Sequence, residues 1–319
     1  MSAGAAGPRG GAQPIIVIAG PTATGKTAVA VELAHKLNTE IISSDSMQVY
    51  RHLTIGTAKP TPEELRGVVC HLVDHVPPDR QYSLGDFVEE ADALITAIRG
   101  KGRVPVVCGG TGMYLKGLLH GIFGGVTRDE AVRAELAREA DERGLDAMHA
   151  ELMRSDPAAT HIMPNDRQRI LRALEVLRVT GVPITALQTQ HNGPARHANR
   201  MFVLRLPREE LNARIDARVD AMVAHGLLDE VRAYLAEGHS RANPAVRALG
   251  YGELIAHVEG ELPLEKALDA MKRKTRQYSK RQMTWFRSVR GAVWVDVSGR
   301  SAEDVAREVL GGMGGGSER

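Results

Sequence analysis

The sequence has little cysteine and lacks any long apolar run. Its 319 residues include two cysteines, Cys70 and Cys108, without a CxxC pair or a His–Cys cluster, so we expect neither a disulfide framework nor a zinc site. This cysteine usage favours a reducing cytoplasm. No segment approaches the length of a membrane span, and residues 1–12 lack the apolar region of a signal peptide. We therefore predict a cytoplasmic protein without a membrane partner, with residues 1–12 and 311–319 disordered.

An excess of charge of one sign is also missing. The net charge is only +2, and 43% hydrophobic with 25% charged residues is ordinary for a soluble globular protein. Overall charge therefore does not predict a nucleic-acid binder, and the distribution of charge along the chain is more informative. The length allows one large α/β domain with an insertion, and we expect a monomer without an obligate protein partner.

Short apolar segments alternate with helical patterns in the first third of the chain. Strands are predicted at 14–19, 40–44 and 104–108, and helices at 27–37 and 86–99. This order is the βαβ pattern of an α/β protein with a P-loop NTPase-like, doubly wound parallel sheet.

The pattern changes after residue 121. Residues 122–200 are charged, helical in pattern and poor in strand formers, so we predict an all-helical insertion domain there. The core domain then comprises residues 13–121 and 201–310. Its later strands are predicted at 201–206 and 292–297, and its later helices at 209–236, 251–258 and 264–287.

The segment GPTATGKT fits the phosphate-binding pattern GxxxxGK[ST] and stands between a predicted strand and a predicted helix. Glycines let backbone N–H groups curl around an anion, and the helix N-terminus adds partial positive charge. We predict that Lys26 neutralises a terminal phosphate and that the Thr27 hydroxyl binds Mg²⁺. The pattern does not distinguish a nucleoside triphosphate from an allylic diphosphate. The predicted phosphate-binding residues are Gly20, Pro21, Thr22, Ala23, Thr24, Gly25, Lys26 and Thr27.

Polar residues follow two other predicted strands, at the sheet edge that carries the P-loop. A carboxylate at Asp45 can hold magnesium or act as a general base, and an Asx-turn or helix-cap role is the alternative. The Thr111 hydroxyl can bond a leaving oxygen or cap a helix. Gln48 carries an amide that can pair with an adenine edge.

A basic segment covers residues 272–290, with eight Lys and Arg residues and no acid. Positive charge combined with aromatic surfaces suits a single-stranded RNA loop, so we predict RNA binding by this helix, including Lys280 and Arg281. The interleaved aromatic residues are Tyr278, Trp285 and Phe286, of which the last two are expected in the core. A second basic helix in the insertion carries Arg167, Arg169, Arg172 and Arg178.

Taken together, these motifs resemble the tRNA dimethylallyltransferase (tRNA isopentenyltransferase) family, bacterial type. The resemblance covers nearly the whole chain outside the Gly-rich ends, and many blocks in the right order make it specific. The blocks are GPTATGKT at 20–27, SSDSMQVYRHLTIGTAKP at 43–60, HLVD at 71–74, GGTGMYL at 109–115, NDRQRILRALEV at 165–176, RIDARVDAMVAHGLLDEV at 214–231, LGYGEL at 249–254 and QYSKRQMTWFR at 277–287.

The resemblance implies transfer of a dimethylallyl group from dimethylallyl diphosphate, held with Mg²⁺, to N6 of the adenosine 3′ of the tRNA anticodon. Asp45 matches the general base, Thr111 the reaction-centre threonine, and Arg218 the arginine that reaches the diphosphate. The residues predicted to contact tRNA are Asp45, Ser46, Met47, Gln48, Thr111, Arg133, Gln168, Arg169, Ile170, Leu171, Arg172, Lys280 and Arg281.

The chain departs from the family pattern in small ways. Cys70 and His71 stand where a His-His pair is frequent, and nothing resembles the C-terminal zinc finger of eukaryotic members. Adenylate-prenylating relatives tend to carry Ser-Asn where this chain has Thr111 and Gly112, which favours the tRNA branch. The alternatives are an adenylate isopentenyltransferase, a small-molecule P-loop kinase, for which the basic helix has no purpose, and a non-enzymatic RNA-binding module.

Overall fold

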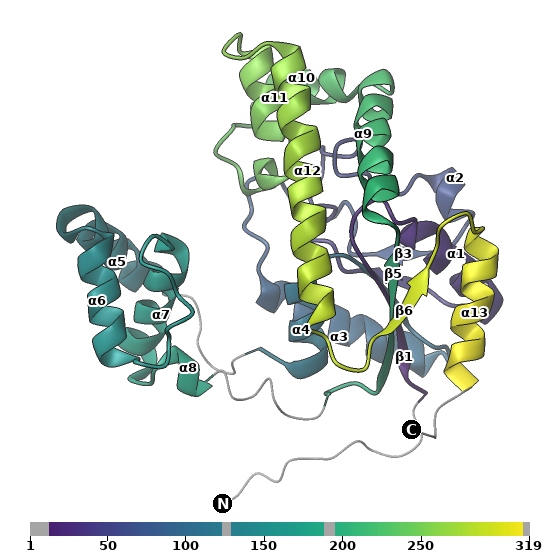
Figure 1. Cartoon of the computed structure of the whole chain (residues 1–319), viewed down its shortest axis with the longest axis horizontal. Coiled ribbons are helices and arrows are strands. Elements are labelled where there is room, and N and C mark those ends of the chain that lie inside the picture. Colours follow the sequence, from purple (N-terminus) through teal and green to yellow (C-terminus); the bar gives the residue numbers. More distant parts are fainter. Residues whose placement is uncertain (1–12, 123–128, 188–194, 315–319) are drawn as a thin grey trace, which may run out of the picture. The chain divides into compact units, whose positions relative to one another are not determined.

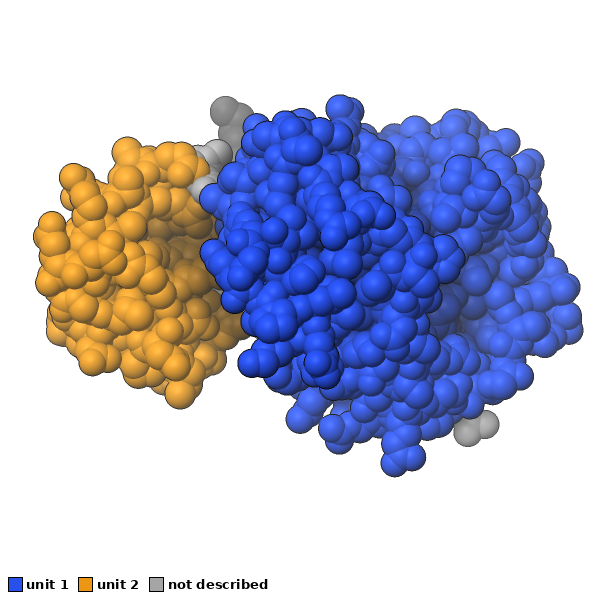
Figure 2. All heavy atoms as spheres, turned by 90° about the horizontal axis from the view of Figure 1, so that it is seen from above, with its two compact units in different colours: residues 1–119, 197–319 blue, residues 120–196 orange. Residues whose placement is uncertain are grey.

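The computed structural model describes residues 13–122, 129–187 and 195–314. The chain forms two compact units, one from residues 1–119 and 197–319 and the other from residues 120–196 (Figure 2). The sequence placed the insertion at 122–200. The predicted disorder of residues 1–12 and 315–319 lies outside the described residues.

The larger unit is built on a six-stranded sheet in which every pairing is parallel (Figure 1). The strand order is β3-β2-β4-β1-β5-β6, with β1 Ile15–Ala19, β2 Ile41–Ser43, β3 Cys70–His71, β4 Val106–Gly109, β5 Asn199–Arg205 and β6 Val293–Asp296. All predicted strands are confirmed. The two-residue β3 was missed, because so short a strand leaves no periodic pattern.

Both faces of the sheet are covered, as a doubly wound fold requires. Along β1, Ile15, Val17 and Ala19 pack in one core cluster and Ile16 and Ile18 in the other, because successive strand residues point to opposite faces. The first face is covered by α3 Leu84–Gly100, α4 Gly112–His120 and α12 Leu264–Arg287, and the same core cluster continues into α10 Leu227–Ala236 and α11 Tyr251–Val258. The second is covered by α1 Lys26–Leu37, α13 Ala302–Gly314 and the start of α9 Arg208–Ala224.

Two expectations about the helices of this unit are wrong. The predicted helix 209–236 is two helices, α9 and α10, because Gly226 adopts a left-handed conformation (φ 95°) that interrupts the helix. Residues 311–314, predicted to be disordered, end α13. Met313 packs on the core, and Arg200 Nη2 donates to the Gly312 carbonyl at 2.5 Å, so this helix end is fixed to β5.

The smaller unit consists of helices among its described residues. They are α5 Glu130–Arg143, α6 Leu145–Ser155, α7 Arg167–Thr180 and α8 Ile184–Leu187. Buried residues such as Leu136, Leu152 and Leu174 form a core of its own. Among all described residues, no helix is long and apolar enough to cross a membrane.

Candidate active site

The loop between β1 and α1 has the shape that its sequence predicts. Gly20 has a φ of 143°, and a Cβ there would lie 2.6 Å from the Leu204 carbonyl oxygen, so only glycine fits between β1 and β5. Thr24 Oγ1 and Lys26 Nζ donate to the Pro21 carbonyl at 2.9 and 2.7 Å. The loop is therefore closed on itself at the N-terminus of α1, where backbone N–H groups are available to an anion.

A cavity of about 690 Å³ opens beside this loop. The cationic residues in its lining outnumber the acidic ones and are Lys26, Arg214, Arg218, Arg247 and Arg281, against Asp45 and Glu64. Its apolar lining includes Met47, Ile215, Val219, Met222, Leu249 and Met271. The cavity thus offers positive charge for an anion together with an apolar wall.

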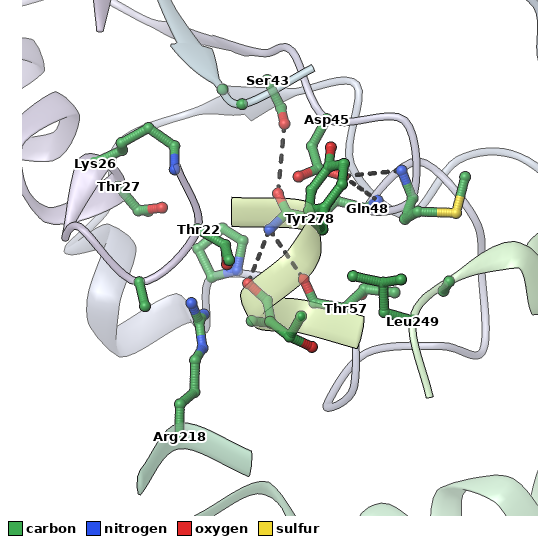
Figure 3. A pocket seen from close by; sticks show the side chains of 18 of the residues that line it. Thr22, Lys26, Thr27, Ser43, Asp45, Gln48, Thr57, Arg218, Leu249 and Tyr278 are labelled. Atoms are coloured by element: carbon green, nitrogen blue, oxygen red, sulfur yellow. Dashed lines mark hydrogen bonds between the residues drawn. The ribbon is translucent and has the colours of Figure 1, made fainter. Parts of the chain in front are cut away.

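Lys26 and Arg218 supply positive charge from two different elements, α1 and α9, and both point into the same space with Thr27 (Figure 3). Burial lowers the pKa of Lys26 to about 8, and the nearby Arg218 also lowers it, while Cys108 and Asp45 act in the opposite direction. Burial likewise lowers the pKa of Arg218. A bound anion would relieve the cost of holding these two cations together.

Asp45 follows β2 and lines the cavity. Its Oδ1 accepts from the Met47 and Gln48 N–H groups at 2.9 and 3.3 Å, so the Asx-turn considered as an alternative is present. A carboxylate has a second oxygen, so the turn and a chemical role are compatible, and the turn fixes the direction of the side chain.

Thr111 does not line the cavity, although Gly109 and Gly110 beside it do. Its Oγ1 accepts from the Ser46 N–H at 3.1 Å, and its own N–H donates to the Ser44 carbonyl at 3.3 Å. These bonds join the segment after β4 to the segment that carries Asp45. In this structure the hydroxyl therefore positions its neighbours, beside the cavity-lining Gly109 and Gly110.

The Gln48 side chain forms hydrogen bonds within the protein, in place of the adenine contact predicted for it. Its Oε1 accepts from Ser43 Oγ at 3.4 Å, and its Nε2 donates to the Thr57 and Ala58 carbonyls at 3.2 and 2.9 Å (Figure 3). The amide is satisfied within the protein, so the expected pairing of this amide with an adenine edge is not available in this conformation.

Sequence reasoning missed Gln282 of α12, and it named Tyr278 only as an aromatic surface for RNA; both face the site. Gln282, 7% exposed, accepts from the Thr22 N–H at 3.0 Å and donates to the Gly110 carbonyl at 2.8 Å, which ties the phosphate loop to the segment after β4. Tyr278 lies one helical turn earlier and lines the cavity; burial and the nearby Asp45 raise its pKa to about 12. Their spacing of four residues was the available signal.

Another missed residue is Glu230 in the first turn of α10. Its carboxylate accepts from the Thr54, Ile55 and Gly56 N–H groups at 2.6, 2.7 and 3.3 Å, and from the Tyr251 hydroxyl at 2.6 Å. Glu230 therefore holds residues 54–56. The carbonyls of the next two residues, Thr57 and Ala58, accept the hydrogen bonds of Gln48. A lone glutamate at a helix start gives no sequence signal for such a role.

Some basic residues of α12 are paired with acids and others are not. Lys272 pairs with Asp220 at 2.6 Å, Lys274 with Glu253, and Arg276 with Asp216, the acids belonging to α9 and α11. The prediction that this segment lacks acidic partners is therefore wrong for these three residues, because the partners come from other helices. Within the part of the chain that the structure describes, no acid pairs with Lys280 or Arg281, and Arg281 lines the cavity. Phe286 is fully buried and Trp285 packs on the core, as predicted.

Most side chains of the smaller unit that were predicted to contact tRNA are also buried or paired with acids. Ile170 is fully buried in the core of that unit and Leu171 packs against it, so neither side chain offers itself to a ligand. Arg133 and Arg172 pair with the buried Glu175 at 3.1 and 2.9 Å. Arg169 pairs with Asp166 at 3.4 Å, while Gln168 is exposed.

Fold and cavity together define a P-loop-like α/β protein with a cationic cavity that also holds a carboxylate. The model of the IPP transferase family matches residues 48–289, and the model of the isopentenyl transferase family matches residues 13–77. The chain belongs to the IPP transferase family.

Relatives extend over most of the chain. It is 47% identical to a tRNA dimethylallyltransferase of Syntrophobacter fumaroxidans over 89% of this chain and 84% of the relative, and 46% identical to one of Symbiobacterium thermophilum over 93% of each. A solved tRNA isopentenylpyrophosphate transferase of Bacillus halodurans shares 38% identity over 95% and 97% of the two chains, with a TM-score of 0.71. A eukaryotic dimethylallyltransferase acting on tRNA shares 29% identity over 90% and 75%, with a TM-score of 0.79.

Proposed function

We propose that this chain transfers a dimethylallyl group from dimethylallyl diphosphate to N6 of the adenosine 3′ of the anticodon in tRNA, releasing diphosphate. Relatives named for this activity support the proposal. The observation that carries it is the meeting of the P-loop, Arg218 and Asp45 at one cavity with an apolar wall. We further propose that the enzyme acts in the cytoplasm as a monomer.

The cationic side of the cavity suits the diphosphate of the donor. Diphosphate leaves readily only when its growing negative charge is neutralised, which Lys26 and Arg218 can do from two directions. The residues Gly20 to Thr27 offer N–H groups to the phosphate oxygens. The apolar side chains, among them Met222 and Leu249, suit the five-carbon chain.

The residues present also fit Mg²⁺, which prefers hard oxygen ligands. The Thr27 hydroxyl lies in the first turn of α1, and Thr27 lines the cavity that Asp45 also lines. We propose Thr27 as a ligand. The ion would contribute further neutralisation of the diphosphate charge.

The acceptor chemistry is assigned to Asp45. The adenine N6 attacks the allylic carbon, the bond from that carbon to the diphosphate oxygen breaks, and the Asp45 carboxylate accepts the N6 proton. The adenosine must leave its stack to reach the cavity, which is least costly in an RNA loop. Thr111 accepts a hydrogen bond from Ser46, the residue next to the general base Asp45, so we propose a positioning role for Thr111.

The RNA itself requires a wider surface than the cavity. We propose that Lys280 and Arg281 contact backbone phosphates of the anticodon stem-loop, together with Arg133, Gln168, Arg169 and Arg172 of the smaller unit. The arginines named there have acidic neighbours, so an RNA phosphate would have to compete with Glu175 or Asp166.

The test is transfer of label from dimethylallyl diphosphate, with Mg²⁺, to an unmodified anticodon stem-loop, with AMP and ADP as competing acceptors. Asp45→Asn should lower kcat about 10² to 10⁴-fold. Its amide oxygen can still accept the N–H groups of Met47 and Gln48, so the loop keeps its shape. Diphosphate-donor binding should change little.

The other outcomes separate the alternatives. Label in AMP or ADP alone would place the chain with the adenylate isopentenyltransferases. Failure to label any acceptor, combined with phosphate transfer from ATP to a metabolite, would contradict prenyl transfer in favour of a kinase. Full activity of Asp45→Asn would contradict the assignment of the base.

A further inference from the structure

Two histidines and a glutamate meet at a place that the transfer reaction does not use. His52 lies in the segment between β2 and α2 Pro62–Leu65, and Glu237 and His239 directly follow α10. His52 Nδ1 is 2.7 Å from Glu237 Oε2, and His239 Nε2 is 3.6 Å from the same oxygen. One ligand atom from each residue lies within 4.8 Å of the other two. We propose that these three residues bind a divalent transition-metal ion of the Zn²⁺ type.

The donor set suits such an ion. Two imidazole nitrogens and one carboxylate oxygen are a common set of three protein ligands for zinc, with a fourth position left to water. Ligands about 2.0–2.2 Å from a tetrahedral ion lie about 3.3–3.6 Å from one another. Of the distances found here, 3.6 Å fits this range, 2.7 Å is shorter, and all separations in the cluster are within 4.8 Å. Small rotations of the side chains would therefore complete the site.

The position of His239 is fixed before any ion binds. Its ring packs against Tyr234, which is 1% exposed, with the ring centroids 4.7 Å apart. Its backbone N–H donates to the Tyr234 carbonyl at 3.3 Å. On the other side its ring lies 4.8 Å from the ring of His52. One ligand is thus held by the core, which lowers the entropy that binding would cost.

His52 shows that the arrangement has an energetic cost. Its φ of 68° is in the left-handed region, which residues other than glycine adopt rarely and at a cost. Both imidazoles lie beside the same Glu237 oxygen, so an ion bound at that oxygen would find the three ligand groups already gathered.

Water and ions reach the cluster freely. The side chains of His52, Glu237 and His239 are 39%, 49% and 23% exposed. None of the three lines the cavity at the P-loop. Metal binding can therefore be measured independently of prenyl transfer.

A bound ion would join α10 to the segment that Glu230 already holds. Glu230 binds this segment at Thr54 to Gly56, and its next carbonyls, those of Thr57 and Ala58, hold Gln48. The ion would add an attachment at His52, on the other side of these residues. We therefore expect a gain in stability, because an ion that binds only the folded chain raises Tm.

The experiment titrates the tag-free full chain with Co²⁺ in excess Mg²⁺, which occupies hard oxygen sites. Four-coordinate Co²⁺ gives visible absorption bands, and Zn²⁺ should remove them at one equivalent. His52→Gln and His239→Gln should each weaken Co²⁺ binding at least tenfold, and stoichiometric Zn²⁺ should raise the Tm of the unchanged chain but not the Tm of these two variants. His35→Gln, at an exposed position of α1, is the matched control and should bind as the unchanged chain does.

His239→Gln also loses a ring packed on the core, so His52→Gln, at a more exposed position, decides the result if the former does not fold. Absence of the bands from the unchanged chain would overturn the proposal. So would equal affinity in His52→Gln and His35→Gln. In either case the three residues form only an ion-pair cluster.

Discussion

Two neighbouring stretches of α12 carry basic residues but differ in what surrounds them. In residues 272–276, Lys272, Lys274 and Arg276 are paired with acids of α9 and α11. In residues 278–282, Tyr278, Arg281 and Gln282 line the cavity. A run of basic residues in a sequence therefore mixes residues that join helices with residues that face a ligand, and only the neighbouring elements separate them.

Within α12, the largest effect should come from Gln282, which joins the phosphate loop to the segment after β4. Gln282→Ala removes both bonds, and a small displacement of the loop should lower kcat/KM about 100-fold. Gln277→Ala, at an exposed position of the same helix, is the control and should leave the rate within twofold of its original value. Steady-state kinetics with a check of Tm measures this, and equal rates in the two variants would contradict the role of Gln282.

The next effect concerns RNA. Arg281→Ala should weaken binding of the stem-loop about tenfold and reduce the slope of log K against log salt by about 0.7–1. Lys274→Ala should change affinity by less than about twofold, because Lys274 is already paired with Glu253. Fluorescence anisotropy over a range of salt compares them. If both variants weaken binding equally, the two stretches of the helix do not differ in function.

The third prediction concerns pH, which should affect Lys26 in the cavity differently from a lysine on a helix surface. The pKa of Lys26 is lowered to about 8, so the protonated form is lost as pH rises through that value, well before an ordinary lysine would lose it. Relative to a Lys26→Arg variant measured at the same pH, the affinity for inorganic diphosphate should therefore fall above pH 8. Calorimetry on both proteins measures this. Because the folded state disfavours the charged form, Lys26 itself lowers stability below pH 8, and this cost fades between pH 8 and its ordinary pKa of 10.5.

The smallest effect is expected in residues 272–276 of α12. Lys272→Ala breaks a partly exposed pair with Asp220 and should lower the free energy of unfolding by about 0.2–1 kcal/mol. High salt should reduce the difference between the variant and the unchanged chain. Urea unfolding at two salt concentrations tests this, and a loss several times larger would mean that the pair contributes more than screening allows.

The sequence was sufficient for five of the six strands, the phosphate loop and the location of Asp45, since each depends on a local pattern. It was not sufficient for Gln282, Glu230 and Glu175, because their partners lie far away along the chain. The roles predicted for Gln48 and Ile170 do not match the structure for the same reason. A motif identifies a segment, whereas burial and hydrogen bonds determine which of its side chains are available to a ligand. The helix α13 was not predicted, and its end was expected to be disordered because glycines favour disorder locally; packing on β5 outweighs that preference.

The smaller unit has a separate hydrophobic core, and its chain leaves the larger unit after Leu119 and returns at His197. Substitutions among its residues need not alter the packing under the P-loop, since no core cluster is shared. Such a division allows natural selection to vary one part while the other stays constant. A laboratory exchange of residues 120–196 with those of a relative is therefore a practical route to chimeras with new substrate preferences.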